Sequence, residues 1–67
     1  MERNLRINWN AIIQEAIKRR KEQKLTQKQL AILCDVSGPT INAFEQGKTT
    51  IKLDSVFKIL RNLGLLE

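Results

Sequence analysis

The sequence predicts an all-α fold, a compact bundle of four to five short helices around one core. Apolar residues recur at helical spacing along most of the chain, and no alternating strand pattern competes with them over that length. The chain has 67 residues, and a domain of this size buries only about 60% of the surface that its unfolded chain exposes. We therefore expect one small domain over residues 1–67, of marginal stability and without room for a deep substrate cleft.

The first helix is predicted by an apolar stripe near the N-terminus. Asn8 or Asn10 can cap its start, because an asparagine side chain accepts a hydrogen bond from an amide of the first turn. The stripe ends in a basic run, residues 18–24, followed by Leu25. Its members fall at i, i+3, i+4, i+7, i+8 and i+11, which is one face of a helix: Trp9, Ile12, Ile13, Ala16, Ile17 and Arg20.

A second helix is predicted from Gln27 to about Leu33. Thr26 stands three residues before Gln29, which is the spacing of a capping box. The segment Asp35-Val36-Ser37 then ends this helix.

A third helix is predicted over about residues 38–46. Ser37 is a candidate N-cap, Pro39 is tolerated in the first turn, and Gly47 suits a left-handed residue after the last turn. Two short helices joined by a tight turn, here about residues 26–46, are typical of helix-turn-helix DNA binding, although any small bundle contains helix pairs.

A fourth helix follows a loop over residues 48–52. Gly64 closes it, and only a short apolar end remains, in which Leu65 and Leu66 are either a frayed terminus or a dimer contact. The stripe that predicts this helix consists of Leu53, Val56, Phe57, Leu60 and Leu63.

The net charge of +5 is concentrated in the first part of the chain. Residues 1–28 hold eight basic and three acidic side chains, whereas residues 29–67 hold four of each. The basic run over residues 18–24 is either a patch that binds a polyanion such as nucleic acid, or a solvated helix end whose cations complement the helix dipole. Charge alone leaves both interpretations open.

The sequence has few of the residues that catalysis or metal binding commonly uses. The chain has no histidine, the commonest general base and metal ligand, and Cys34 has no second cysteine to pair with. We therefore expect no enzyme activity, no metal and no cofactor, and we interpret Cys34 as a small core or boundary residue. A lone thiol fits a reducing, cytoplasmic compartment. Because no signal peptide and no membrane-length apolar segment is present, we expect a soluble protein without a membrane partner.

Residues 25–48 read LTQKQLAILCDVSGPTINAFEQGK, and this pattern closely resembles the Cro/cI-type (XRE, lambda-repressor-like) helix-turn-helix family. The resemblance extends over about residues 10–64. Residues 44–65 look particularly like HipB-type antitoxins, which usually add a short C-terminal strand that is truncated or missing here. The positions that match the family pattern are Leu25, Thr26, Gln27, Leu30, Ala31, Val36, Ser37, Ile41, Glu45, Gly47 and Lys48.

The resemblance implies one pair of residues with a structural role and one set of residues that bind phosphates. Arg20 and Glu45 resemble a pair that forms a structural salt bridge between the first and third helices. The positions that would contact DNA phosphates are Thr26, Gln27, Gln46, Lys48 and Thr49.

The resemblance also implies a base-reading face on the third helix, and here the sequence departs from other members. Those often carry Arg, Gln or Lys at several of these places, whereas here Asn42 is the only amide. We therefore expect sequence discrimination to rest on few direct contacts and on DNA shape. The face consists of Gly38, Pro39, Thr40, Asn42 and Ala43.

Two functional hypotheses follow from the resemblance. The first is a sequence-specific regulator that binds double-stranded DNA as a homodimer and represses by occupying an operator. The second is an antitoxin of the HipB type, which binds a toxin partner and represses its own operon.

Overall fold

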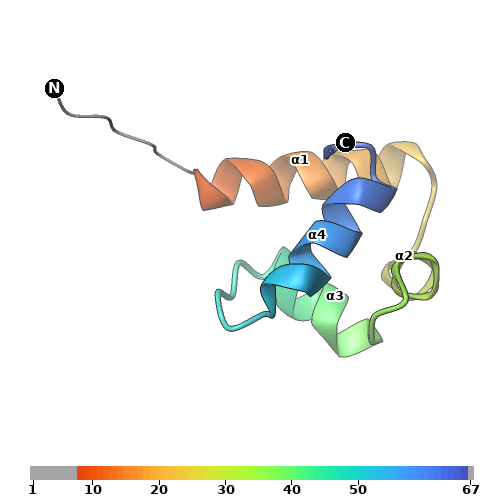
Figure 1. The fold of residues 1–67 in the computed structure, drawn as a ribbon. Coiled ribbons are helices and arrows are strands. Elements are labelled where there is room, and N and C mark those ends of the chain that lie inside the picture. The colour runs from red at the N-terminus through yellow and green to blue at the C-terminus, as the bar shows by residue number, and fades with distance from the viewer. Residues whose placement is uncertain (1–7, 67) are drawn as a thin grey trace, which may run out of the picture.

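The computed structural model describes residues 8–66, and these residues form four α-helices without a strand. The helices are α1 (Trp9–Glu22), α2 (Gln27–Cys34), α3 (Gly38–Glu45) and α4 (Leu53–Asn62). In Figure 1, α4 crosses in front of α3 and brings its C-terminal end up to α1, while α2 lies near the N-terminal end of α3. The predicted all-α bundle is confirmed, with four helices in this part of the chain.

The first three helices begin at the side-chain caps that the sequence predicts. The Asn8 side chain accepts a hydrogen bond from the amide of Ala11, and Ser37 Oγ accepts one from the amide of Thr40. Thr26 and Gln29 form both hydrogen bonds of a capping box. The N-cap of α4, Lys52, makes no side-chain cap.

The tight turn between α2 and α3 depends on a left-handed residue that is not glycine. Asp35 adopts φ 58°, and the amide of the next residue, Val36, donates to the carbonyl of Ala31 at 3.0 Å. Short polar side chains tolerate this conformation better than most. Gly47 follows Gln46, the C-cap of α3, and has φ 85°, the left-handed conformation that the sequence predicts there.

The core gathers one face from each helix. Trp9 covers its edge: the indole Nε1 donates to the carbonyl of Gly47 at 3.1 Å, and the ring meets Phe44 edge-to-face with centroids 5.7 Å apart. Cys34 is buried in this core, and burial raises the pKa of its thiol, so the side chain behaves as a small apolar group. The buried residues are Ile13, Ala16, Leu30, Ala31, Cys34, Ile41, Phe44, Val56, Ile59 and Leu63.

The apolar stripe predicted for α4 is partly wrong. Leu53 is 66% exposed and Phe57 is 41% exposed, whereas Ile59, which was not in the stripe, is fully buried. Val56, Ile59 and Leu63 are spaced i, i+3 and i+7 and share one helix face, and Phe57 lies one residue further around the helix from Val56. Two overlapping stripes fit the sequence, and packing against the other helices selects the one that contains Ile59.

None of the helices in residues 8–66 is long and apolar enough to cross a membrane.

Candidate nucleic-acid interface

The unit formed by α2, its turn and α3 holds two short helices in fixed relation. Leu30 of α2 and Ile41 and Phe44 of α3 are buried at their junction, and Ala31 is 4% exposed. A small side chain at Ala31 allows the two helices to approach closely. The side of α3 that faces away from α2 and the core lies on the molecular surface.

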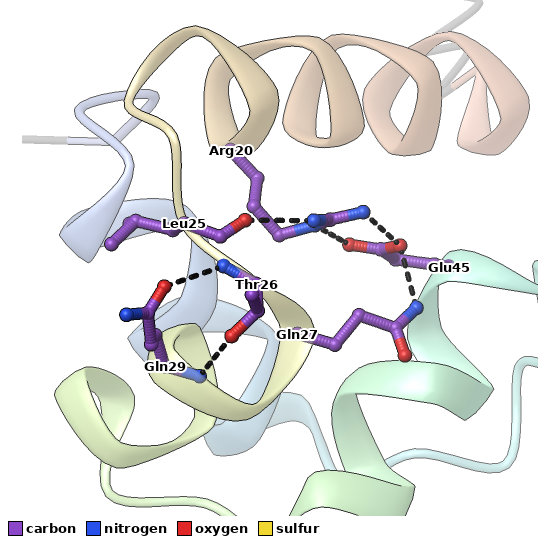
Figure 2. A network of polar contacts seen from close by, with 6 residues as sticks. All are labelled: Arg20, Leu25, Thr26, Gln27, Gln29 and Glu45. Carbon is purple, nitrogen blue, oxygen red and sulfur yellow. Dashed lines mark hydrogen bonds and ion pairs between the residues drawn. The ribbon is translucent and has the colours of Figure 1, made fainter.

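A largely buried ion pair anchors the C-terminal end of α3 to α1 (Figure 2). Arg20 Nε donates to Glu45 Oε2 at 2.6 Å, and Arg20 Nη2 donates to Glu45 Oε1 at 3.1 Å. Arg20 Nη1 also donates to the carbonyl of Leu25 at 2.8 Å. The two side chains are only 12% and 9% exposed, so this bidentate pair is shielded from solvent. The pair implied by the resemblance is present, and it fixes α1, the loop before α2, and α3 together.

Gln27 joins the same network from the first position of α2. Its Nε2 donates to Glu45 Oε1 at 2.8 Å, and Figure 2 shows Arg20 and Gln27 reaching this carboxylate from different elements. An amide carries two N–H groups, and no acceptor within residues 8–66 takes the second one. Gln27 is therefore positioned by Glu45 with one donor remaining for a ligand. The two residues are 18 positions apart in sequence. Both match the family pattern, but the pattern does not indicate that their side chains touch.

Thr26 lies beside Gln27 and is exposed. Its Oγ1 accepts from the amide of Gln29 at 3.0 Å, and its own amide donates to Gln29 Oε1 at 2.8 Å. The hydroxyl proton of Thr26 remains able to donate, because capping uses the oxygen only as an acceptor.

The five residues of the predicted base-reading face lie along α3. Gly38, Pro39 and Asn42 are exposed, and Thr40 and Ala43 are half-buried. The Thr40 hydroxyl is 2.7 Å from Ser37 Oγ, so it already has a partner. Asn42 thus presents the one side-chain amide of this face to solvent.

The segment after α3 continues the exposed surface. Gln46 is the C-cap of α3, and its side chain is exposed, as are those of Lys48 and Thr49 in the following loop. The amide of Lys48 donates to the carbonyl of Ala43 at 3.1 Å, which holds the start of this loop against α3.

The basic run over residues 18–24 is divided between inward and outward side chains. Arg20 is taken by Glu45, and Arg19 Nη1 donates to the carbonyl oxygens of Leu63 at 3.2 Å and Gly64 at 3.4 Å. Arg19 also pairs with Glu15 at 3.4 Å. The three lysines of the run are exposed: Lys18, Lys21 and Lys24.

Two comparisons with known proteins bear on this surface. A family model described as helix-turn-helix matches residues 17–66. A Haemophilus influenzae protein named as an uncharacterized HTH-type transcriptional regulator is 40% identical over 63 residues, which is 94% of this chain and 61% of that protein. The chain thus spans about 61% of the length of this relative.

Proposed function

Because the chain belongs to the Cro/cI-type (XRE) helix-turn-helix family, we propose that it is a sequence-specific regulator of transcription that binds double-stranded DNA. The observation that carries the proposal is the placement of α3. Its C-terminal end is fixed by the Arg20–Glu45 pair, and the side of α3 that faces away from the core, which includes Asn42, is exposed. A rigid helix with a free polar face is what entry into the major groove requires.

In this proposal the phosphate contacts surround α3. Gln27 donates its second amide N–H to a phosphate from the start of α2, and Thr26 donates its hydroxyl beside it. On the other side of the reading face, Gln46, Lys48 and Thr49 hold the phosphates that follow. These contacts fix the position of α3 without reading sequence.

Base reading in this proposal is sparse. Asn42 is the side chain with a bidentate donor and acceptor, and Thr40 contributes its methyl group to a thymine. Gly38, Pro39 and Ala43 offer no side-chain hydrogen bond and set how closely α3 approaches the base edges. The remainder of the discrimination comes from DNA shape.

We propose further that residues 1–67 act as one DNA-binding domain in the cytoplasm, and that two copies bind a roughly palindromic operator and repress by occupying it. So few reading side chains in one copy specify little sequence, and a symmetric pair doubles the site. The surface we assign to the pairing is an apolar groove between α1 and the C-terminal end, which is formed by Ala11, Ile12, Leu60, Leu65 and Leu66 together with Glu15.

The test begins with selection of bound duplexes from a random library, followed by titration of a selected and a scrambled duplex. We expect a defined, symmetric preference, two chains per duplex by sedimentation, and half-site centres about 34 Å apart. A dimer meeting ~6–10 phosphates loses ~10³–10⁵ in affinity between about 50 and 200 mM salt. A salt-independent affinity, or a preference for single strands, would contradict the proposal. One chain per site, with a half-site bound equally well, contradicts the dimer.

One observation favours the antitoxin as a second candidate. Ile32 and Leu33 on α2 are 71% and 57% exposed, and with Leu25 and Gln29 they line an apolar depression that suits a protein partner. Under this candidate, Ile32→Ser with Leu33→Ser abolishes neutralisation of the product of a neighbouring toxin gene and leaves DNA binding intact. Absence of any toxin gene beside this one would remove the candidate.

A further inference from the structure

A small pocket of about 240 Å³ opens between the start of α1, the loop after α3 and the first turn of α4. The start of α1 and this loop lie at the same end of the molecule (Figure 1), and the Trp9 indole joins them by donating to the carbonyl of Gly47. The pocket is larger than a cavity of ~150 Å³ that holds benzene, so it has room for one six-membered ring with a short chain. We call it the Trp9 pocket, and its lining consists of Trp9, Lys48, Thr49, Ile51, Leu53 and Val56.

The walls of the Trp9 pocket are apolar, and one of them lacks cover. Leu53 is 66% exposed, whereas Val56, one turn further along α4, is buried. Trp9 is half-buried, and its Nε1 already has an acceptor in Gly47, so the part of the ring that lines the pocket offers apolar contact. A ligand with an apolar body gains free energy by taking these side chains out of water.

One cation lies at the exposed edge of the Trp9 pocket. Lys48 and Thr49 are the polar members of the lining, and both are exposed. Within residues 8–66 the lining contains no carboxylate, and Lys48 forms no ion pair. The complement of an apolar hollow with a single positive charge at its edge is a molecule with an apolar body and a single negative charge. The Thr49 hydroxyl can donate a hydrogen bond to the same anion.

The same two residues connect the Trp9 pocket to DNA. The proposed function assigns Lys48 and Thr49 to the phosphates that follow the reading face. The amide of Lys48 donates to the carbonyl of Ala43 at 3.1 Å, which holds the Lys48 backbone against α3. From this fixed origin, the Lys48 ammonium pairs either with an anion in the pocket or with a DNA phosphate.

We propose that the Trp9 pocket binds a small carboxylate that carries one aromatic ring, with the ring against Trp9 and Leu53 and the carboxylate paired with Lys48. An aromatic ring suits this wall because it packs on an indole in offset or edge-to-face geometry. The ligand takes Lys48 from the DNA phosphate, so it lowers the affinity of the chain for DNA. This second step rests on the proposed function, whereas binding to the pocket does not. The inference places control by a small molecule inside the DNA-binding domain.

The first test measures binding without DNA. Trp9 is the single tryptophan of the chain, so its fluorescence reports on this pocket. The probes are 3-phenylpropionate, its neutral amide 3-phenylpropionamide, and acetate, which has the carboxylate without the ring. We expect a saturable change with the first two, the acid binding about 2- to 5-fold tighter because a partly exposed ion pair contributes modestly, and none with acetate. No saturable change with 3-phenylpropionate up to its solubility limit overturns the inference.

Two matched pairs of variants locate the ligand. Leu53→Ser removes an exposed wall of the pocket, and Ile32→Ser makes a similar change at a comparably exposed side chain of α2. We expect Leu53→Ser to weaken binding of both probes about 10-fold and Ile32→Ser to leave it unchanged. Lys48→Gln should give the acid and the amide equal affinity, whereas Lys18→Gln, at an exposed lysine of α1, should keep the difference. Equal effects of the two serine variants, or an acid that keeps its advantage in Lys48→Gln, overturn the inference.

The second test asks whether the ligand releases DNA. At constant ionic strength, saturating 3-phenylpropionate should raise the Kd of the parent for its selected duplex about 10-fold, the effect of losing one charged hydrogen bond. The amide fills the pocket without taking Lys48, so it should leave the Kd unchanged. In Leu53→Ser, the duplex should bind as it does in the parent, and the acid should no longer release it. An unchanged Kd while the acid fills the pocket overturns the competition for Lys48. A parent that binds the acid but no duplex removes the proposed function and the release step, and supports the binding step alone.

Two other occupants of the Trp9 pocket would give distinct results. If 3-phenylpropionate binds only after Leu5→Ser with Ile7→Ser, then residues 1–7 occupy the pocket. If both Leu53→Ser and 3-phenylpropionate convert a dimer to a monomer in sedimentation without DNA, then a second copy of the chain covers it. Either result overturns the inference.

Discussion

The basic run over residues 18–24 and the surface formed by α3 and α4 use their cations in different ways. In the basic run, Arg20 is buried against Glu45 and Arg19 is bonded to the carbonyl oxygens at the end of α4. Around α3 and α4 the total charge is near zero, yet Lys52 and Lys58 have no acidic partner within residues 8–66. The two arginines of the basic run therefore help to hold the fold together, whereas its three lysines, like Lys52 and Lys58, have no acidic partner within residues 8–66. For a small basic domain, the partner of each cation says more about the DNA surface than the local charge does.

The largest expected effect comes from Arg20→Ala. It leaves the largely buried Glu45 without its cationic partner, which costs up to about 3–5 kcal/mol of unfolding free energy. In a domain of this size that is a large part of the total stability. Urea unfolding followed by circular dichroism measures it, with Lys21→Ala as the control because Lys21 is exposed and close in sequence. Equal urea midpoints for the two variants would mean that Arg20 is a solvated cation like Lys21. The Arg20–Glu45 pair would then not contribute to holding the fold together.

The double variant Arg20→Met with Glu45→Leu sharpens the same point. Replacing both partners by apolar side chains avoids an unpaired buried charge, so it should cost less than Arg20→Ala alone. It also removes the acceptor of Gln27. If the double variant is as unstable as the single one, the loss comes from packing and not from the stranded carboxylate.

On the ligand-binding side of the comparison, the largest effect belongs to Asn42→Ala. Asn42 is exposed and has no described intramolecular partner, so folding stability should not change beyond the small effect of helix propensity. Binding to the preferred duplex should weaken by about 1–3 kcal/mol, and discrimination should be lost at one or two base pairs. Repeating the selection with the variant checks this. An unchanged sequence preference would move the reading face away from Asn42.

Gln27, the first residue of α2, contacts the ion pair and is also a proposed phosphate contact, and Gln27→Ala tests whether one residue can serve both roles. Its hydrogen bond to Glu45 predicts a loss of about 1 kcal/mol in stability, and its second amide N–H predicts weaker binding to all duplexes alike. Lys48→Ala is the matched control, since its side chain is exposed and should weaken DNA binding without a change in stability. A Gln27 variant that loses stability but keeps full affinity would assign Gln27 to the fold alone.

Much of this architecture is readable from local sequence. Helix starts depend on one side chain and an amide two or three residues away, so the sequence predicts three of the four helix starts, at Asn8 or Asn10, at Thr26 and at Ser37, and the structure selects Asn8 for the first. The resemblance adds the residues of α3 that lie together on its exposed face. Both kinds of information concern residues that are close in sequence or belong to a known pattern.

What the sequence does not predict depends on how distant elements meet. Lys58 of α4 lines the same surface depression as Thr40 and Ala43 of α3 because α4 crosses α3 at one particular position, and no local pattern specifies that crossing. Gln27 reaches Glu45 across the helix pair for the same reason. In α4, the choice between Phe57 and Ile59 as the buried residue is made by the shape of the other three helices.

The smallest expected effect separates two neighbours that the sequence treats alike. Arg19 and Lys21 both look like solvated members of the basic run, but Arg19 Nη1 donates to the carbonyls of Leu63 and Gly64 and so ties the end of α4 to α1. Cations are favourable at a helix C-terminus, where carbonyl groups lack intrahelical partners. Because the Arg19 side chain is 38% exposed, solvent screening limits the effect, and we expect Arg19→Ala to lower stability by about 0.5–1 kcal/mol, with no measurable change for Lys21→Ala. Hydrogen exchange provides the sharper readout, since the amides of Leu63, Gly64 and Leu65 should lose protection in the Arg19 variant while those of α2 keep theirs. If α2 and the end of α4 lose protection equally, Arg19 acts on the whole fold, and its bond to α4 is not a local anchor.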